Sequence, residues 1–174
     1  NKDYLTTYEN LALLYLNTAR YTEAERVLQE IRQIKESSFP DEKASIAYTL
    51  SNLAAVKKQI ADYVEAEKLY KEAKAVYETE YGTDHIFYAA VINNMALLYQ
   101  KMGNIEVARP LFMDAMRIYE SQIGKYNPDY ATALENLATL YLMENNYAKA
   151  KELLEEALVI DEQILGKKHP LYSK

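Results

Sequence analysis

The chain has 174 residues, a net charge of −6 and no cysteine. Its 49% hydrophobic and 26% charged residues are typical of a folded protein, and the low numbers of glycine and proline, four each, favour helices over turns. The acidic charge argues against nucleic acid as a partner, the lack of cysteine excludes disulfides and thiolate metal sites, and no apolar run approaches the ~20 residues that span a bilayer. We therefore expect no nucleic acid and no membrane among its partners.

Apolar residues follow helical spacing in successive segments. In chain order, the predicted helices cover about 3–18, 21–37, 43–60, 63–80, 86–101, 105–122, 128–143 and 147–165. The pattern is clear near the end, where Leu134, Leu137, Ala138 and Tyr141 form one stripe and Asn145 interrupts it. Because a turn of about three or four residues separates the members of each pair, the two helices should pack antiparallel.

Glycine is expected to end the second helix of each pair. Gly82, Gly124 and Gly166 suit a left-handed C-terminal cap, and Pro128 and Pro170 suit the first turn of the following helix. The first repeat departs from this pattern, because it has the segment Ser37-Ser38-Phe39-Pro40 in place of glycine. The histidines at 85 and 169 share one position of the junction, where they should cap the next helix or face solvent.

A spacing of 42 residues recurs along the whole chain. An Asn-Leu-Ala or Asn-Met-Ala tripeptide begins at Asn10, Asn52, Asn94 and Asn136, each 42 residues after the last. Many other positions keep the same spacing without an insertion, which predicts four stacked repeats, each a helical pair. The repeats cover about 2–43, 44–85, 86–127 and 128–169 of a single domain spanning 1–174, and 170–174 would begin a further helix. We therefore expect a part of a longer protein.

Small and large residues are expected to have different packing roles in these repeats. Alanines should let neighbouring helices approach closely; they are Ala12, Ala54, Ala96 and Ala138 on the first helices and Ala24, Ala66, Ala108 and Ala150 on the second. The large residues expected to fill the gaps between repeats are Leu28, Tyr70, Phe112 and Leu154. Most of the 17 tyrosines should also point into the core, among them Tyr15, Tyr99, Tyr141, Tyr21, Tyr63 and Tyr147, whereas Tyr48 should face outward.

The motif Asn-Leu-Ala-x-Leu-Tyr, followed by Tyr-x-x-Ala and by Leu-Gly-Lys-x-His-Pro at the junction, resembles the 42-residue tetratricopeptide repeats of kinesin light chains. Similar arrays occur in bacterial proteins, some of which join them to caspase-like peptidase domains. The second repeat departs from the motif, with Lys57 in place of tyrosine. The resemblance implies an all-α, right-handed superhelical solenoid whose first helices line a concave groove that accepts peptides.

The resemblance also selects the groove residues. They are Asn10, Tyr48, Asn52, Gln59, Asn93, Asn94, Leu97, Lys101, Glu135, Asn136 and Thr139. An asparagine amide both donates and accepts hydrogen bonds, so a row of them could hold a peptide backbone. Alternatively, these asparagines tie each helix to its neighbour. A carboxylate clamp of the kind found in part of the family is not expected, because Glu9, Ser51, Asn93 and Glu135 occupy the positions of its cations.

The predicted function is therefore a scaffold that binds a peptide or protein partner in the groove. We expect no enzyme activity, no cofactor and no metal site, since no residue spacing suggests a catalytic arrangement or a phosphate-binding glycine loop. Two alternatives remain open: a self-assembly module that forms a homo-oligomer through its terminal repeats, and a regulatory arm of an enzyme domain outside this sequence. A cytoplasmic location is expected.

Overall fold

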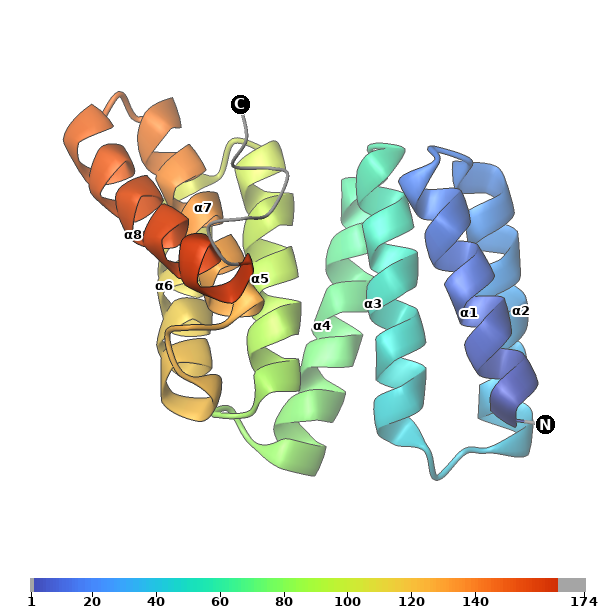
Figure 1. Ribbon diagram of the computed structural model, residues 1–174. Coiled ribbons are helices and arrows are strands. Elements are labelled where there is room, and N and C mark those ends of the chain that lie inside the picture. Colours follow the sequence, from blue (N-terminus) through green and yellow to red (C-terminus); the bar gives the residue numbers. More distant parts are fainter. Residues whose placement is uncertain (1, 166–174) are drawn as a thin grey trace. The chain divides into compact units, whose positions relative to one another are not determined.

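The computed structural model describes residues 2–165, which form helices throughout and contain no strand (Figure 1). The helices are α1 (Lys2–Asn17), α2 (Tyr21–Ser38), α3 (Lys43–Gln59), α4 (Tyr63–Tyr81), α5 (Ile86–Lys101), α6 (Ile105–Ile123), α7 (Pro128–Met143) and α8 (Tyr147–Leu165). The predicted all-α repeat solenoid is thus confirmed, with each helix boundary within one residue of its prediction. Gly166, His169 and the expected further helix from Pro170 lie outside the described residues.

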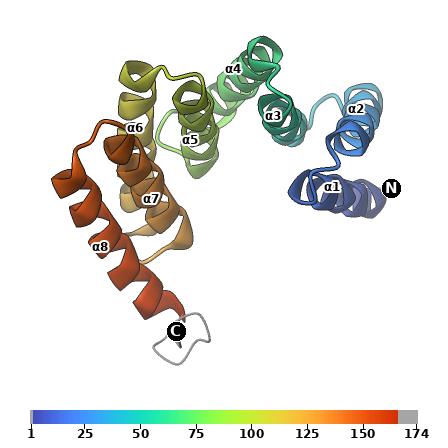
Figure 2. The ribbon, with the colours of Figure 1, turned by 90° about the horizontal axis from the view of Figure 1, so that it is seen from above.

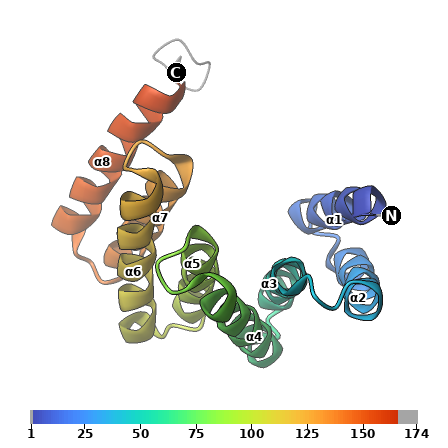
Figure 3. The same ribbon diagram turned by 90° about the horizontal axis from the view of Figure 1, so that it is seen from below.

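The chain divides into two compact units, Asn1–Thr83 with α1 to α4 and Asp84–Lys174 with α5 to α8. Within each unit, two antiparallel pairs pack so that the second helix of one pair contacts the first helix of the next. The views from above and below show α3 beside α2 and α4 in the first unit, and α7 beside α6 and α8 in the second (Figures 2 and 3). We call α1, α3, α5 and α7 the A helices and the others the B helices. That residues 1–174 act as one domain stays a prediction.

Glycine ends α4 and α6, as predicted. Gly82 has φ 84° and ψ 172°, and Gly124 has φ 79° and ψ 168°, a conformation that a side chain would strain. His85 then caps α5 by accepting a hydrogen bond at Nδ1 from the Phe87 N–H, over 3.2 Å. The first unit needs no glycine after α2, because Phe39 ends that helix with φ −140° while its N–H donates to the Lys35 carbonyl.

A left-handed residue forms each turn from an A helix to a B helix. It is Ala19, Ala61, Gly103 or Asn145, with φ between 58° and 80°. The following N–H donates back to the helix, as from Asp62 to the Lys57 carbonyl over 2.9 Å. Left-handed turns at Ala19 and Ala61 could not be expected from the sequence, because alanine rarely adopts positive φ.

Ala61→Gly should therefore stabilise the protein. Removing Cβ relieves a left-handed strain of about 1–2 kcal/mol, and the extra freedom of the unfolded chain cancels part of it, so a net gain of about 0.5–1 kcal/mol is expected in chemical denaturation. Gly103→Ala is the matched control and should lower stability by a similar amount, since a Cβ there would meet open space and only the backbone would be strained. A loss of stability in Ala61→Gly would contradict this account.

The core follows the repeat. The eight alanines predicted to allow close helix contact are fully buried, as are Leu28, Tyr70 and Phe112. Two predictions were wrong, both on α8. Leu154 is 40% exposed because no helix within residues 2–165 covers that side of α8. Tyr147 is 64% exposed, and its hydroxyl donates to Asn145 Oδ1 at the surface. The other tyrosines expected in the core, Tyr15, Tyr21, Tyr63, Tyr99 and Tyr141, are partly buried.

Candidate functional site

The A helices of each unit touch one another directly, α1 with α3 and α5 with α7. Every predicted groove residue lies on these helices. We call the surface of α1 and α3 the first wall; it carries Asn10, Tyr48, Asn52 and Gln59. We call the surface of α5 and α7 the second wall; it carries Asn93, Asn94, Leu97, Lys101, Glu135, Asn136 and Thr139.

A side-chain hydrogen bond joins the two helices of the second wall. Asn136 Nδ2 on α7 donates to Asn93 Oδ1 on α5 over 3.3 Å, and both side chains keep part of their surface exposed. Asn94 and Leu97 are also partly exposed, and Lys101, Glu135 and Thr139 are exposed. Since an amide carries two N–H donors and a carbonyl acceptor, this contact leaves further hydrogen-bonding capacity on both asparagines. Asn93 and Asn136 therefore tie neighbouring helices together and still face solvent.

The equivalent contact is missing from the first wall. Among the described residues, Asn52 Nδ2 is buried without a hydrogen-bond partner. In the first unit, the residue that takes the place of the acceptor Asn93 is Glu9 of the first repeat, and its Oε1 already accepts from Lys35 and Thr49. Asn10 and Gln59 are exposed, and Tyr48 is 44% exposed, which agrees with the outward orientation expected for it.

A buried ion pair holds the first wall to the helix behind it. Lys35 on α2 is 3% exposed, and its Nζ lies 2.7 Å from Glu9 Oε1 on α1. The same Nζ donates to Thr49 Oγ1 and to the Ser45 carbonyl on α3, each over 3.1 Å. One ammonium group thus links α1, α2 and α3. Lys35 was not among the predicted site residues, although the sequence carries a signal for it: a lysine occupies a position that holds Tyr77 and Tyr119 in the next two repeats.

Buried tyrosines take the place of Lys35 in those repeats. Burial raises the pKa of Tyr77 to about 12, and the nearby Tyr48, Tyr81 and Glu9 add to that rise. Burial also raises the pKa of Tyr119, with a further contribution from Asp129. Both hydroxyls therefore keep their protons at neutral pH, and the helices behind the walls carry no tyrosinate charge at these two positions.

Sequence comparison identifies the repeat. The profile described as Tetratricopeptide repeat matches residues 3–79, 45–121 and 87–163, which together cover most of the chain. The chain belongs to the tetratricopeptide repeat family. The predicted resemblance is thus confirmed. Members of this repeat family generally mediate protein–protein interactions and are generally non-enzymatic scaffolds.

Solved structures of similar fold agree with this assignment. BtubC (BKLC) from P. vanneervenii has a TM-score of 0.77 and 26% identity, over 95% of this chain and 66% of that one. A putative kinesin light chain with nearly identical TPR-like repeats from Podosopora anserina gives 0.77 and 22% identity, over 99% and 82% of the two chains. A second crystal structure of those repeats gives 0.76 and 22%, over 97% and 79%. This tetratricopeptide repeat chain therefore spans just under two thirds of BtubC. A comparison with curated proteins finds no match.

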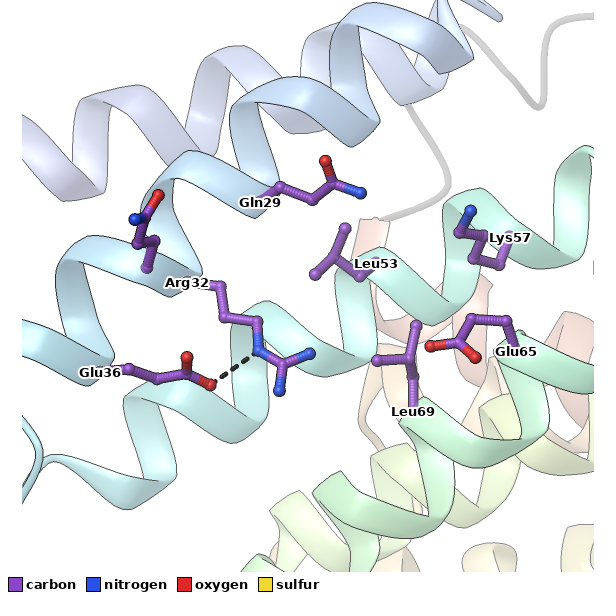
Figure 4. A pocket seen from close by; sticks show the side chains of 8 residues that line it. Gln29, Arg32, Glu36, Leu53, Lys57, Glu65 and Leu69 are labelled. Carbon is purple, nitrogen blue, oxygen red and sulfur yellow. Dashed lines mark hydrogen bonds and ion pairs between the residues drawn. The ribbon is translucent and has the colours of Figure 1, made fainter.

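A polar surface pocket lies away from the walls of this tetratricopeptide repeat chain, among α2, α3 and α4 (Figure 4). Its empty volume is about 440 Å³, and Leu53 and Leu69 are its apolar lining. Its cations already have acidic partners: Arg32 Nε donates to Glu36 Oε1 over 2.7 Å, and Lys57 Nζ lies 2.9 Å from Glu25 Oε1. The hydrogen bond to Glu25 raises the pKa of Lys57. Because these charges are paired within the protein, the pocket is a weaker candidate site than the walls.

Within residues 2–165, the repeats show no group of acidic or histidine side chains arranged to hold a metal ion. None of the helices in this part of the chain is long and apolar enough to cross a membrane.

Proposed function

We propose that this tetratricopeptide repeat chain binds a peptide segment of a partner protein on a wall formed by the A helices of one unit. The observation that carries the proposal is the Asn136–Asn93 hydrogen bond. It fixes two amides from neighbouring helices on one partly exposed surface, each with donors or acceptors still available. A peptide backbone presents donors and acceptors in alternation, so paired amides complement it whatever its side chains are.

The side chains around this amide pair suit a peptide that has both apolar and charged residues. Leu142 and Met143 expose apolar surface at the end of α7, while Lys101 and Glu135 bring charges of opposite sign. On the first wall, Tyr48 offers an aromatic surface of the kind that anchors partners at interfaces. We infer that side-chain preference comes from these residues and that the amides hold the backbone.

Peptides selected from a random displayed library against the chain would test the proposal. Asn136→Ala and Asn93→Ala should each weaken the binding of the selected peptides by about tenfold, because each removes amide groups worth about 1–2 kcal/mol at a partly buried site. Affinities would be measured by fluorescence anisotropy with labelled peptides.

Asn104→Ala provides the matched control. It makes the same chemical change at an exposed position in the turn before α6, where the side chain makes no capping hydrogen bond. Its affinity should equal that of the parent. If Asn136→Ala and Asn93→Ala bind the peptides as tightly as Asn104→Ala does, and all three remain folded by circular dichroism, the second wall does not hold the ligand.

A further inference from the structure

A second pocket lies within the unit formed by α5 to α8, where the turn from α7 to α8 meets α6. Its empty volume is about 620 Å³. It is lined by Arg109 on α6, Tyr141 on α7, Glu144 and Asn146 in the turn, and Lys149 on α8. Four of these five side chains carry hydrogen-bond donors, and two of the four are cations. None of the five is among the predicted groove residues.

The one carboxylate that lines this pocket is already engaged. Glu144 forms an ion pair with Arg109 and so holds the turn against α6. Arg109 Nη1 also lies 3.3 Å from Glu106 Oε2, but the Glu106 side chain is 84% exposed, where an ion pair contributes little. Asn146 Oδ1 accepts from the backbone N–H of Lys149 over 3.4 Å, which leaves its Nδ2 donors for another partner. The carboxylate and the amide oxygen are therefore both engaged within the protein.

The ammonium group of Lys149 contacts an aromatic ring rather than a carboxylate. Its Nζ lies 5.1 Å from the centre of the Tyr141 ring, and within residues 2–165 it forms no ion pair. The Tyr141 hydroxyl likewise makes no hydrogen bond in the described part of the chain. The face of a ring attracts a cation without neutralising its charge. Lys149 and Tyr141 thus present a positive charge and an O–H donor for which the described residues supply no acceptor.

The first unit fills the same positions with the opposite charges. Two repeats earlier, the counterparts are Glu25 for Arg109, Lys57 for Tyr141, Asp62 for Asn146 and Glu65 for Lys149. Lys57 Nζ lies 2.9 Å from Glu25 Oε1 and 3.5 Å from Asp62 Oδ2, so these charges are balanced within the protein. In the second unit, cations or an amide replace the three acidic residues, and a neutral ring replaces the lysine. Only Glu144, which pairs with Arg109, offsets this excess of positive charge in the pocket.

We propose that this pocket binds a phosphate group, carried either by a small molecule or by a phosphorylated side chain. Lys149 supplies the attracting charge, and the Tyr141 hydroxyl and the Asn146 amide donate hydrogen bonds. A tetrahedral phosphate presents acceptor oxygens in several directions, which suits donors that come from α7, from the turn and from α8. A planar carboxylate would use fewer of them. This site involves no groove residue and does not rest on the proposed peptide binding.

A titration with inorganic phosphate, at neutral pH and constant ionic strength and followed by the backbone amide signals in nuclear magnetic resonance spectra, tests the proposal. Signals of residues 144–149 should shift in a saturable manner. Lys149→Glu should weaken binding at least about tenfold, because a repelling charge replaces an attracting one. Tyr141→Phe keeps the ring beside Lys149 and should weaken binding about three- to tenfold through the loss of one donor. Since Lys149 is exposed, its substitution should leave the fold intact, as circular dichroism would verify.

A phosphoserine with an acetylated N-terminus and an amidated C-terminus distinguishes the two sources of the phosphate group. If it binds more tightly than inorganic phosphate and shifts the same signals, the site takes a phosphorylated side chain. If it binds equally or more weakly, the site takes a small phosphate compound. Both results support a phosphate site.

Lys151→Glu is the matched control. It makes the same charge change on α8 at a 74% exposed side chain outside the pocket, whose ammonium group pairs with Glu155 over 3.6 Å. It should bind phosphate like the parent. Equal weakening by Lys151→Glu and Lys149→Glu would mean that phosphate responds only to overall charge and would overturn the proposal. The proposal also fails if acetate shifts the same signals at the same concentrations, or if the parent shows no saturable shift at residues 144–149.

Discussion

Replacing Lys35 by methionine should lower the free energy of unfolding by about 3–5 kcal/mol, the cost of breaking a buried ion pair from one side. The variant leaves the Glu9 carboxylate nearly buried and uncompensated in charge, with only the Thr49 hydroxyl donating to it, and it also removes a donor to the Ser45 carbonyl. The loss should appear in urea denaturation followed by circular dichroism. Lys68→Met is the matched control, because Lys68 pairs with Glu65 at an exposed position, where such pairs contribute about 0–1 kcal/mol.

The double variant Lys35→Met and Glu9→Met identifies the cause. If the loss comes from an uncompensated charge, removing the carboxylate as well should recover most of the stability, because apolar residues of similar volume often replace buried ion pairs without cost. If the double variant is as unstable as the sum of the two single variants, the contact of Lys35 with Glu9 is not the source of the effect.

Phe112→Ala should destabilise the protein by about 3–5 kcal/mol, the range for removing a fully buried phenylalanine. Phe112 is 0% exposed and fills the joint between α6 and α7 with Leu137 and Leu140, so the substitution leaves a cavity that the surrounding alanines are too small to close. Phe87→Ala offers the same chemical change on α5 at a 43% exposed position and should cost about 1 kcal/mol or less. Equal losses in the two variants would place Phe112 outside the core of the joint.

The helices and their boundaries could be predicted because the same residue pattern recurs in each of the four repeats. Positions such as Ala24, Ala66, Ala108 and Ala150 carry the same residue in every repeat and are fully buried in all of them. The errors in predicted burial arose where equivalent positions have different neighbours in the structure. Leu154 shares its position with three buried residues, but no described neighbour covers it, so sequence equivalence did not translate into burial.

The arrangement of the walls could be predicted only in part, for a similar reason. The asparagines at 52 and 136 are equivalent in sequence, but only Asn136 finds an amide acceptor on the neighbouring A helix. In the first unit Glu9 lies at that acceptor position, and its Oε1 already accepts a hydrogen bond from Lys35 on α2. Whether Asn52 or Asn136 finds a hydrogen-bond acceptor depends on the other bonds of that acceptor. In the first unit those bonds involve residues of three helices, so the repeating position alone does not predict them.

The hydrogen bonds of Lys35 oppose a shift of one helix along another in the first unit in a way that has no counterpart at the equivalent position of the second unit. In the first unit, a shift of α3 along α2 would separate one ammonium group from the Thr49 hydroxyl and the Ser45 carbonyl together, so small displacements are penalised at once. In the second unit, Phe112 packs among leucines through contacts that are weakly directional. A small shift of α3 along α2 is therefore opposed by directional bonds at Lys35, whereas packing at Phe112 alone does not fix the register of α7 on α6, and the directional contact there is the ion pair of Arg109 with Glu144 at the end of α7.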